Sequence, residues 1–325
     1  MIKSFKVTNY VGDSITLELT RPDKTGFIVK SVDGLGPVKA TINMTSTPTY
    51  DGALFNSARL DKRNIILSLD FMELPERKDE NGKLLPYETI EHIRQKSYKY
   101  FPLKKKLHLV VETDNRLVET EGYVESNEPN IFSNQEGCTI SILCPDSFFY
   151  SLESATTVFS GIKPLFEFPF SCESIEKDES GSFHRGDPTI EMSQIVTRQS
   201  HLVRYDGDVD VGVTIVVHAV DDVEKLVVTN ETTLESMSID DDKLIASTGS
   251  GITAGDTITI ETRKGYKSIT LLRDGETINI LNSLGKNSKW FNLVRGNNAF
   301  RYSATGNGFA SLQFSIYNKV VYEGV

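Results

Sequence analysis

The chain has 325 residues, of which 38% are hydrophobic and 25% charged, a composition typical of a globular protein with one large core or two smaller ones. Its 35 basic and 45 acidic side chains give a formal net charge of -10, which argues against a protein whose main task is to grip phosphate backbones. No run of about 20 apolar residues could span a bilayer, and residues 1–8 lack the apolar stretch of a signal peptide. We therefore expect a soluble protein made in the cytoplasm.

Alternation of apolar and polar residues predicts antiparallel strands in the first half of the chain. The pattern occurs at Ile15–Leu19, at Val38–Ile42 after the turn-like Asp33–Pro37, and at Ile65–Phe71. We expect these to be half-buried strands. The same alternation continues after the following helix in three segments: 107–111, 116–123 and 138–144.

The three cysteines, an odd number without a secretion signal, predict no disulfide framework. They are Cys138, Cys144 and Cys172. Six residues along a strand separate Cys138 from Cys144 by roughly 20 Å, which excludes a disulfide. Since the two alternate with Ile140 and Ile142 on one face, we expect core thiols rather than a redox or metal pair.

Only one segment has a helical period. Pro86 would open this helix and Pro102 would stop it, while Ile90, Ile93, Ser97 and Tyr100 would share its apolar face. The charged stretch Glu73–Leu85 just before it contains Pro and Gly. It predicts a long loop or arm that serves a purpose outside the core.

In the second half, residues 151–188 are predicted to be irregular, and short strands separated by Gly, Asn and Asp turns follow them. The predicted strands lie near residues 211–219, 226–228, 258–260, 269–271, 278–281 and 312–316. Such a pattern favours a β-sandwich. We expect two domains, 1–150 and 151–325, with formal charges of -2 and -8 respectively.

The search for chemistry returns no catalytic constellation, cofactor motif or metal-ligand spacing. The five histidines are scattered: His92, His108, His184, His201 and His218. Asp206–Asp210 begins like a calcium loop, but Val211 and Val217 replace the required Gly and Glu, so a hairpin turn is favoured. Asp240–Asp242 is typical of a charged surface, although a cation there stays open. We therefore expect no enzyme, no cofactor and no metal.

Two further features of the sequence can each be interpreted in two ways. Lys104–Lys106 is either a solvated strand entrance or a patch that faces a polyanion or a partner. Trp290, the single tryptophan, favours a core or interface position.

The order of several strings resembles the distal tail proteins of long-tailed phages and prophages of Gram-positive bacteria. In the first half the strings are Asp33–Pro37, Tyr50–Gly52, Arg63–Leu67, the helix, and Ile140–Phe149, where Ser147 replaces a proline usual in that family. In the second half they are Gly207–Gly212, Ala254–Ile260, Gly265–Ile269, Leu293–Asn298 and Tyr322–Val325. The resemblance spans nearly the whole chain.

This resemblance implies a mainly β protein, with an N-terminal split-barrel-like domain akin to the tail-tube fold, carrying one helix, and a C-terminal galectin-like β-sandwich. It also implies a homohexameric ring at the virion tail tip, as a single ring or as stacked rings. The ring would join the tail tube to a tail-associated lysin, hub or fibre protein, adjoin the tape measure protein and pass DNA through its channel.

We expect the arm and the helix to form oligomer contacts, because a closed ring needs heterologous interfaces. The candidate residues are Glu73, Arg77, Lys83, Tyr87, Arg94 and Tyr98. A non-catalytic module that recognises cell-wall glycans is the alternative, although the His-x-Asn-x-Arg string of sugar-binding galectins is missing. A third reading, an enzyme with a cryptic site in a β-sandwich, would need distant carboxylates or histidines to meet in one pocket.

Overall fold

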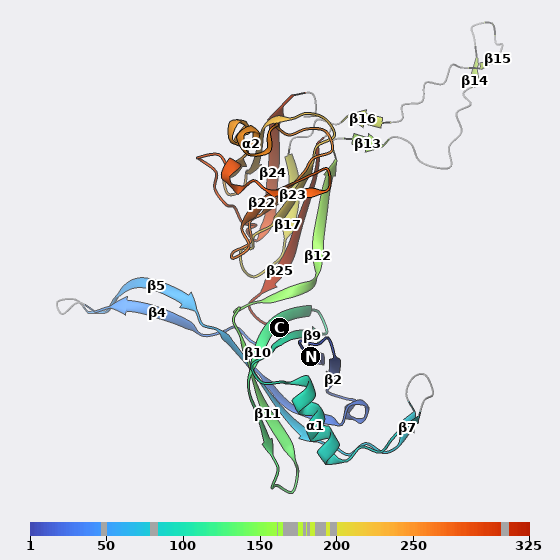
Figure 1. Cartoon of the computed structure of the whole chain (residues 1–325), viewed down its shortest axis with the longest axis vertical. Helices are drawn as coiled ribbons and strands as arrows, with labels where there is room; N and C mark the ends of the chain where they lie inside the picture. The colour runs from blue at the N-terminus through green and yellow to red at the C-terminus, as the bar shows by residue number, and fades with distance from the viewer. Residues whose placement is uncertain are drawn as a thin grey trace. The chain divides into compact units, whose positions relative to one another are not determined.

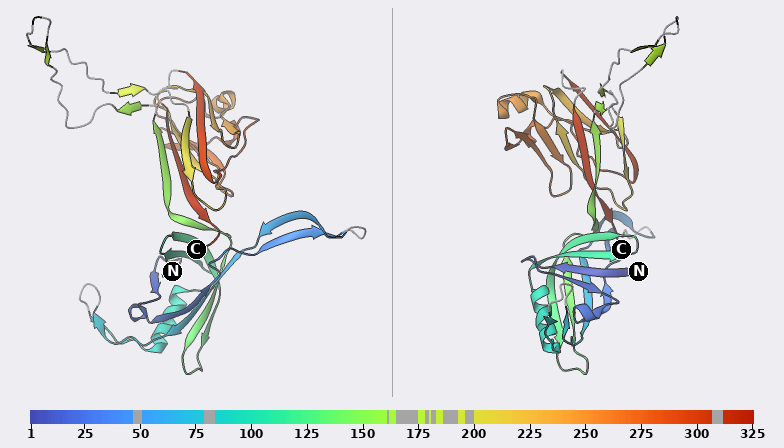
Figure 2. Two further views of the ribbon diagram at one scale, coloured as in Figure 1. Left: turned by 180° about the vertical axis from the view of Figure 1, so that it is seen from behind. Right: turned by 90° about the vertical axis from the view of Figure 1, so that its right-hand side faces the viewer.

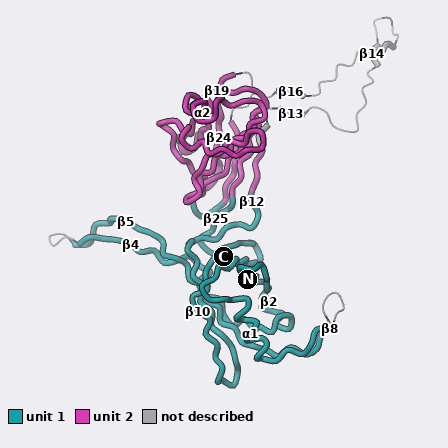
Figure 3. The backbone as a smooth tube through the Cα atoms, in the orientation of Figure 1, with its two compact units in different colours: residues 1–154, 207–209, 319–325 teal, residues 155–206, 210–318 magenta. Residues whose placement is uncertain are grey.

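The computed structural model describes residues 1–46, 51–78, 84–160, 162–164, 175–177, 180, 183–185, 193–195, 200–306 and 312–325. The chain forms two compact units, which Figure 3 colours separately. Unit 1 contains residues 1–154, 207–209 and 319–325, and unit 2 contains residues 155–206 and 210–318. Strands dominate both units, so the predicted mainly β class is confirmed.

Unit 1 is a split-barrel-like β structure with one α-helix among its described residues (Figure 1). Its elements in chain order are β1 (Ile2–Thr8), β2 (Ser14–Glu18), the 3-10 turn η1 (Pro22–Lys24), β3 (Phe27–Asp33), β4 (Ala40–Thr45), β5 (Leu54–Leu60), β6 (Arg63–Phe71), β7 (Arg77–Lys78), β8 (Leu84–Leu85), α1 (Ile90–Tyr100), β9 (Lys106–Thr113), β10 (Leu117–Asn130), β11 (Gly137–Cys144) and the start of β12 (Phe149–Ser160).

The main sheet of unit 1 runs in the order β2-β1-β9-β10, and it continues from β10 through β11 and β6 to β3, with every pair antiparallel. Residues that alternate along these strands point into one core. The fully buried members include Phe5, Leu67, Leu109, Ile140 and Ile142. The predicted half-buried strands at 15–19 and 65–71, and the core position of Cys138 and Cys144, are confirmed.

Helix α1 covers this core with the predicted face, because Ile93 and Ser97 are buried while Ile90 and Tyr100 pack against the core from its edge. It begins four residues later than predicted from Pro86. Glu88 is held in a β-bridge to Leu74, and Thr89 then caps the helix by accepting a hydrogen bond from the His92 amide.

Two hairpins project from unit 1 (Figures 1 and 2). One is β7–β8, so the segment predicted as a long loop or arm is a hairpin closed by the Leu74–Glu88 bridge. The other is β4–β5, whose residues are exposed along both strands. The prediction that Val38–Ile42 forms a half-buried strand was therefore wrong, since this strand leaves the core.

Unit 2 is a β-sandwich, as predicted, with its two sheets visible in the upper part of Figure 1. Its elements are the remainder of β12, β13 (Ile162–Pro164), β14 (Ile175–Lys177), β15 (Phe183–Arg185), β16 (Ser193–Ile195), β17 (Ser200–Tyr205), β18 (Thr214–His218), β19 (Glu224–Asn230), β20 (Glu235–Ser238), α2 (Asp241–Thr248), β21 (Thr257–Glu261), β22 (Ser268–Arg273), β23 (Glu276–Asn279), the 3-10 turn η2 (Leu281–Ser283), β24 (Gly296–Thr305) and β25 (Gln313–Tyr322).

One sheet of unit 2 has the order β25-β18-β21-β22-β23, and the other has the order β17-β24-β19-β20. Between them, buried aliphatic residues alternate along β18, β21 and β22. Aromatic rings fill the rest of the core: Tyr302 stacks on Phe314 with a centroid separation of 4.3 Å, and Phe291 meets Phe300 edge-on at 5.6 Å.

Two predictions for the second half of the chain were wrong. Residues 151–160 were predicted to be irregular, but β12 continues through them as a regular strand. A second helix, α2, occupies residues where no helical period was recognised. Asp240 caps α2 by accepting a hydrogen bond from the Lys243 amide, and Gly249 ends it in the left-handed conformation. The acidic cluster at 240–242 is thus the start of a helix.

Among the described residues, no helix is long and apolar enough to cross a membrane.

Candidate interaction surfaces

The β4–β5 hairpin is a two-stranded ribbon with one apolar face. Its register pairs Ala40 with Leu60 and Ile42 with Ala58, and after a β-bulge between Asn43 and Met44 it pairs Met44 with Phe55. Ala40, Ile42 and Met44 share one side because alternate residues of a strand share a face, and their cross-strand partners lie on that side too. The other side is mostly polar. It carries the pairs Thr41–Arg59, Asn43–Ser57 and Thr45–Leu54.

Nothing in the described part of the chain covers the apolar face. The exposed fractions are 54% for Ile42 and Met44, 64% for Phe55 and 40% for Leu60. A two-stranded ribbon is marginally stable in water unless its apolar face packs on something else. Exposed apolar faces of this kind mark interaction sites, so the ribbon is a candidate docking surface.

Five of the six residues predicted as oligomer contacts are described, and they lie on or beside the β7–β8 hairpin and α1. Glu73 and Tyr87 are exposed and bonded to each other, since the Tyr87 hydroxyl donates to the Glu73 carboxylate at 2.6 Å. This bond, the largest contribution, together with burial and the nearby charge, raises the pKa of Tyr87. Tyr98 is exposed on α1, and Lys83 lies outside the described residues.

The two predicted arginines are largely committed to partners within unit 1. Arg94 donates to Glu136 at 2.9 Å, and Arg77 lies 3.6 Å from Glu88, which also binds Lys96. These contacts fix the hairpin and the helix against the body of unit 1. Tyr87 and Tyr98 present exposed aromatic rings, with exposed fractions of 47% and 44%.

Arg63, the first residue of β6, is fully buried, and its hydrogen bonds go to backbone carbonyls rather than to a carboxylate. The guanidinium donates to the carbonyls of Gly34 at 2.5 Å, Gly36 at 2.7 Å, Ser147 at 2.7 Å and Glu323 at 2.7 Å. Its central carbon also lies 4.1 Å from the centroid of the Phe149 ring. One side chain thus joins three loops that are far apart in sequence.

The last residues of the chain are held at the same place. Arg116 donates to the Gly324 carbonyl at 2.7 Å and covers the ring of Tyr322, while the Val325 amide donates to the carbonyl of Leu35 at 3.0 Å. Asp208 adds an ion pair to Arg116 at 3.6 Å. Asp208, the middle residue of the acidic turn at 206–210, therefore contributes to this junction within unit 1.

The outward face of the β1–β9–β10 sheet is mainly polar, with Val110 and Leu117 among its apolar members. Its side chains alternate with the buried ones and include Ser4, Lys6, Thr8, Lys106, His108, Glu112, Glu119, Glu121 and Tyr123. Several pair across the strands: Lys106 with Glu121 at 2.8 Å, His108 with Glu119 at 2.8 Å, and Ser4 with Glu112 at 2.9 Å. Lys106 of the predicted basic cluster is thus partly neutralised.

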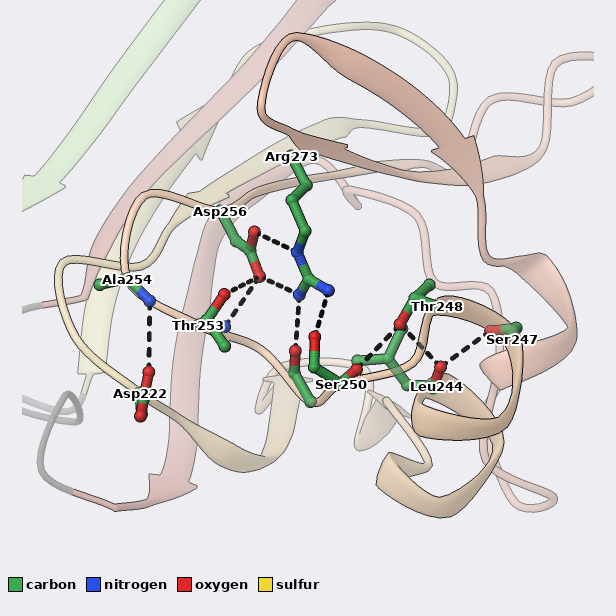
Figure 4. Close-up of polar contacts among 10 residues, drawn as sticks. Asp222, Leu244, Ser247, Thr248, Ser250, Thr253, Ala254, Asp256 and Arg273 are labelled. Carbon is green, nitrogen blue, oxygen red and sulfur yellow. Dashed lines mark hydrogen bonds and ion pairs between the residues drawn. The ribbon is translucent and has the colours of Figure 1, made fainter.

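In unit 2 a buried carboxylate binds an arginine, as Figure 4 shows. Asp256 is 1% exposed; it accepts bonds from Arg273 at 2.5 and 2.8 Å and from the Thr253 amide at 2.8 Å. Arg273 also donates to Ser250 and to the Gly251 carbonyl. Burial disfavours the Asp256 charge, but these bonds outweigh it and hold the pKa of Asp256 below its ordinary value. The network ties the loop after α2 to β22.

Among the described residues, no three His, Cys, Asp or Glu side chains lie close enough to hold a metal ion. Burial raises the pKa of Cys138 to about 12 and that of Cys144 to about 11. Both thiols are therefore protonated and unreactive at neutral pH. Cys172 lies outside the described residues.

Solved phage proteins are similar to this chain, whereas no family model and no curated protein matches it. The SPP1 Dit (gp 19.1) protein, described as a paradigm of the hub adsorption apparatus in phages that infect Gram-positive bacteria, superimposes with a TM-score of 0.59 at 12% identity. The match covers 98% of this chain and 99% of that one. This chain has the SPP1 Dit fold.

Two structures of the phage P2 baseplate in its activated conformation are also similar. The one with Ca gives a TM-score of 0.45 at 11% identity and covers 98% of this chain and 99% of that chain. The one with Sr gives 0.44 at 10% identity, with 98% of each chain covered.

In this Dit-like fold, strings that are distant in the sequence meet around Arg63. Asp33–Pro37 supplies the Gly34 and Gly36 carbonyls, Ile140–Phe149 supplies Ser147 and Phe149, and Tyr322–Val325 supplies Glu323. Gly34 has φ +85°, and a Cβ there would lie 1.9 Å from the Asn64 carbonyl oxygen, so only glycine fits. The sequence reasoning recognised these strings but had no signal that they converge on a buried arginine.

Proposed function

We propose that this protein is a non-enzymatic structural hub of a phage or prophage tail tip. In this proposal it forms a hexameric ring that connects the tail tube to a tail-associated lysin, hub or fibre protein and leaves a channel for DNA ejection. The observation that carries the proposal is the SPP1 Dit fold over 98% of the chain. Residues 1–150 would form the ring, and residues 151–325 the outer sandwich.

The β4–β5 ribbon supports self-assembly. Its apolar face, formed by Ala40, Ile42, Met44, Phe55, Ala58 and Leu60, needs a cover that the described part of its own chain does not supply. A ring is built from heterologous contacts, in which one surface of a subunit binds a different surface of the next. A projecting ribbon meets that requirement, and Tyr87 and Tyr98 would extend the contact on the α1 side.

The polar face of the β1–β9–β10 sheet supports a channel. Lysines on this face would slow DNA by binding phosphates. Lys106 is paired with Glu121, Glu119 is paired with Lys319, and the charge of Glu112 offsets that of Lys6. With its charges balanced in this way, such a surface would bind DNA only weakly. We propose that it faces the lumen of the ring.

The mass of the purified full-length protein, measured by light scattering after size exclusion, tests the proposal together with negative-stain images of the same peak. We expect a ring of six subunits, or two such rings stacked, with a central hole. A protein that stays monomeric at tens of micromolar and shows no annulus would contradict self-assembly. Binding to purified tail tubes, followed by co-sedimentation, tests the proposed position at the tail tip.

A further inference from the structure

Two neighbouring loops of unit 2 gather basic and aromatic side chains in an otherwise acidic half of the chain. The first loop, residues 262–267, joins β21 to β22 and carries Arg263, Lys264, Tyr266 and Lys267. The second, residues 285–290, follows η2 and carries Lys286, Lys289 and Trp290. The Lys267 ammonium lies 5.4 Å from the centroid of the Trp290 ring, so the two loops form one surface.

Each aromatic ring of this surface is stacked with a cation. Arg263 lies over Tyr266 at 5.4 Å, as Lys267 lies over Trp290. Arg263 is neutralised by Glu261, which it binds through two bonds of 2.8 Å. The four lysines are different, because none forms an ion pair with a carboxylate of a described residue. They are Lys264, Lys267, Lys286 and Lys289.

The backbone holds the two loops in defined positions. The first loop turns on Gly265, which has φ +87°, and the Tyr266 amide donates to the Arg263 carbonyl at 3.0 Å. In the second, the Lys289 amide donates to the Ser236 carbonyl at 2.8 Å. Tyr266 remains 69% exposed while Trp290 is half-buried. An unpaired basic surface with an open aromatic ring is therefore fixed on the fold.

We propose that this surface, formed by residues 262–267 and 285–290, binds a sparsely charged anionic glycan. Its phosphates or carboxylates would bind Lys264, Lys267 and Lys289, and the apolar C–H face of a sugar would pack on Tyr266. The site lies within unit 2, so it goes beyond the proposed hub function and does not depend on ring formation.

The charge balance favours a sparsely charged ligand over a nucleic acid. Residues 151–325 carry a formal charge of -8, which repels a ligand with one phosphate per nucleotide. Proteins that bind single-stranded nucleic acid without sequence preference use several exposed aromatic rings, on which successive bases stack. Here a cation lies over both rings, but Trp290 is half-buried whereas Tyr266 is 69% exposed, so this surface offers one open ring and not a series.

Binding of the full-length protein to immobilised polymers tests the proposal. The probes are a phosphomannan, in which only some of the sugars carry a phosphate, and hyaluronan, which carries one carboxylate per disaccharide. The comparison polymers are neutral dextran, poly-L-glutamate and single-stranded DNA. We expect saturable binding to at least one anionic glycan, weakened by salt, and none to dextran or poly-L-glutamate. A response to phosphate alone or carboxylate alone identifies the anionic group that is recognised.

The variant pair Lys267→Glu/Lys289→Glu should weaken this binding by about a hundredfold, since each lost charge-assisted contact costs about tenfold. Tyr266→Ala should weaken it by about tenfold. The matched controls are Lys104→Glu/Lys105→Glu and Tyr10→Ala, because Lys105 lies over Tyr10 at 5.1 Å in unit 1. These should bind the glycan like the parent protein.

Three results would overturn the proposal: no binding to either anionic glycan, equal binding to poly-L-glutamate or DNA, or loss of binding in the unit 1 controls instead. The oligomeric mass of every variant is measured in parallel. If the protein forms a ring but does not bind glycan, the glycan site is rejected and the hub function is not affected. If the protein is a monomer that binds glycan, ring assembly is rejected and the glycan site is supported.

Discussion

Arg63 donates hydrogen bonds to backbone carbonyls of three loops, and this explains why its cationic side chain is buried without a carboxylate partner. Loops that enter a core carry carbonyl groups that must be paired, and the planar guanidinium offers five donors in a fixed fork. Burial lowers the pKa of Arg63, but an arginine stays protonated in proteins. Its charge is spread over four carbonyl dipoles and the face of Phe149.

We expect Arg63→Met to destabilise unit 1 by about 3 kcal/mol, because it leaves several buried carbonyls unpaired although the volume is similar. Urea unfolding followed by circular dichroism measures the loss. Arg59→Met is the control: Arg59 is exposed on the polar face of β5, so its replacement should stay within about 0.5 kcal/mol. Equal midpoints for the two variants would show that the carbonyl bonds contribute little.

Asp256 should make unit 2 sensitive to acid. Its pKa lies below the ordinary value of 3.8, since burial is outweighed by the bonds from Arg273 and Thr253. A carboxyl whose pKa is lower in the folded chain stabilises the fold above the unfolded pKa, and this contribution disappears as the pH falls through the folded pKa. Stability from this pair is therefore complete above pH about 4 and lost below it.

The comparison that tests this is Asp256→Asn against the parent protein, by thermal unfolding from neutral pH into the acid range. At neutral pH the variant should be less stable by about 3 kcal/mol, because Arg273 keeps a buried charge without its partner. The difference should shrink as the pH falls below about 4. A difference that does not change with pH would mean that packing, not charge, causes the loss.

The buried cysteines should be inert in the folded protein. With the pKa of Cys138 about 12 and that of Cys144 about 11, almost no thiolate is present at pH about 8. In a Cys172→Ser variant we expect a thiol reagent to react only after denaturant is added, and then with both thiols. Fast labelling of the native variant would show that the β11 region opens more readily than its burial suggests.

At the scale of elements, the β4–β5 ribbon shows that a strand that packs on its own chain and a strand with an uncovered apolar face have the same sequence pattern. Ala40, Ile42 and Met44 alternate with polar residues just as Leu67 and Leu69 do, but the second pair is buried by other strands and the first three are not. Alternation predicts a strand with one apolar face. Whether the same chain or another molecule covers that face is decided by tertiary packing.

The same limit explains what else the sequence could and could not predict. The buried faces of β6, β9, β11 and α1 follow from periodicity alone. Helix α2 has eight residues and one buried side chain, Leu244, so its period was too short to recognise, although Asp240 and Gly249 are ordinary helix boundaries. The proposed contacts at 73–98 were inferred from the length of the arm and the need of a ring for heterologous interfaces, and the apolar ribbon was missed.

The ribbon's faces allow a matched test of assembly. We expect Met44→Thr/Phe55→Thr to reduce the oligomer to smaller species without lowering the unfolding midpoint, because these side chains are exposed in the isolated subunit. Leu54→Thr is the control, since Leu54 is equally exposed, at 64%, but lies on the opposite face. Light scattering after size exclusion distinguishes them. If Leu54→Thr dissociates the oligomer and the double variant does not, the polar face is the one that binds.

At the scale of the whole molecule, unit 1 is assembled from segments that the sequence order does not reveal. Its body is residues 1–154, but residues 207–209 and 319–325 also belong to it, so the chain leaves unit 1 and returns twice. The boundary expected near residue 150 assumes that each domain is one continuous stretch of the chain. No periodicity signals the return, because the contacts of the last residues are mainly backbone bonds to Arg63, Arg116 and Leu35.

This arrangement predicts that unit 1 depends on the far end of the chain. Removal of residues 322–325 should leave Arg63 without the Glu323 carbonyl and uncover the region around Leu35, which is 7% exposed. Hydrogen exchange should then speed up at β6 and β11, and strands β18 and β21 of unit 2 should keep their protection. Glu323→Ala is the control because it keeps the backbone carbonyl that Arg63 uses, and its exchange should match the parent protein. Faster exchange in both units of the shortened chain would mean instead that the last four residues support the whole molecule rather than the Arg63 junction.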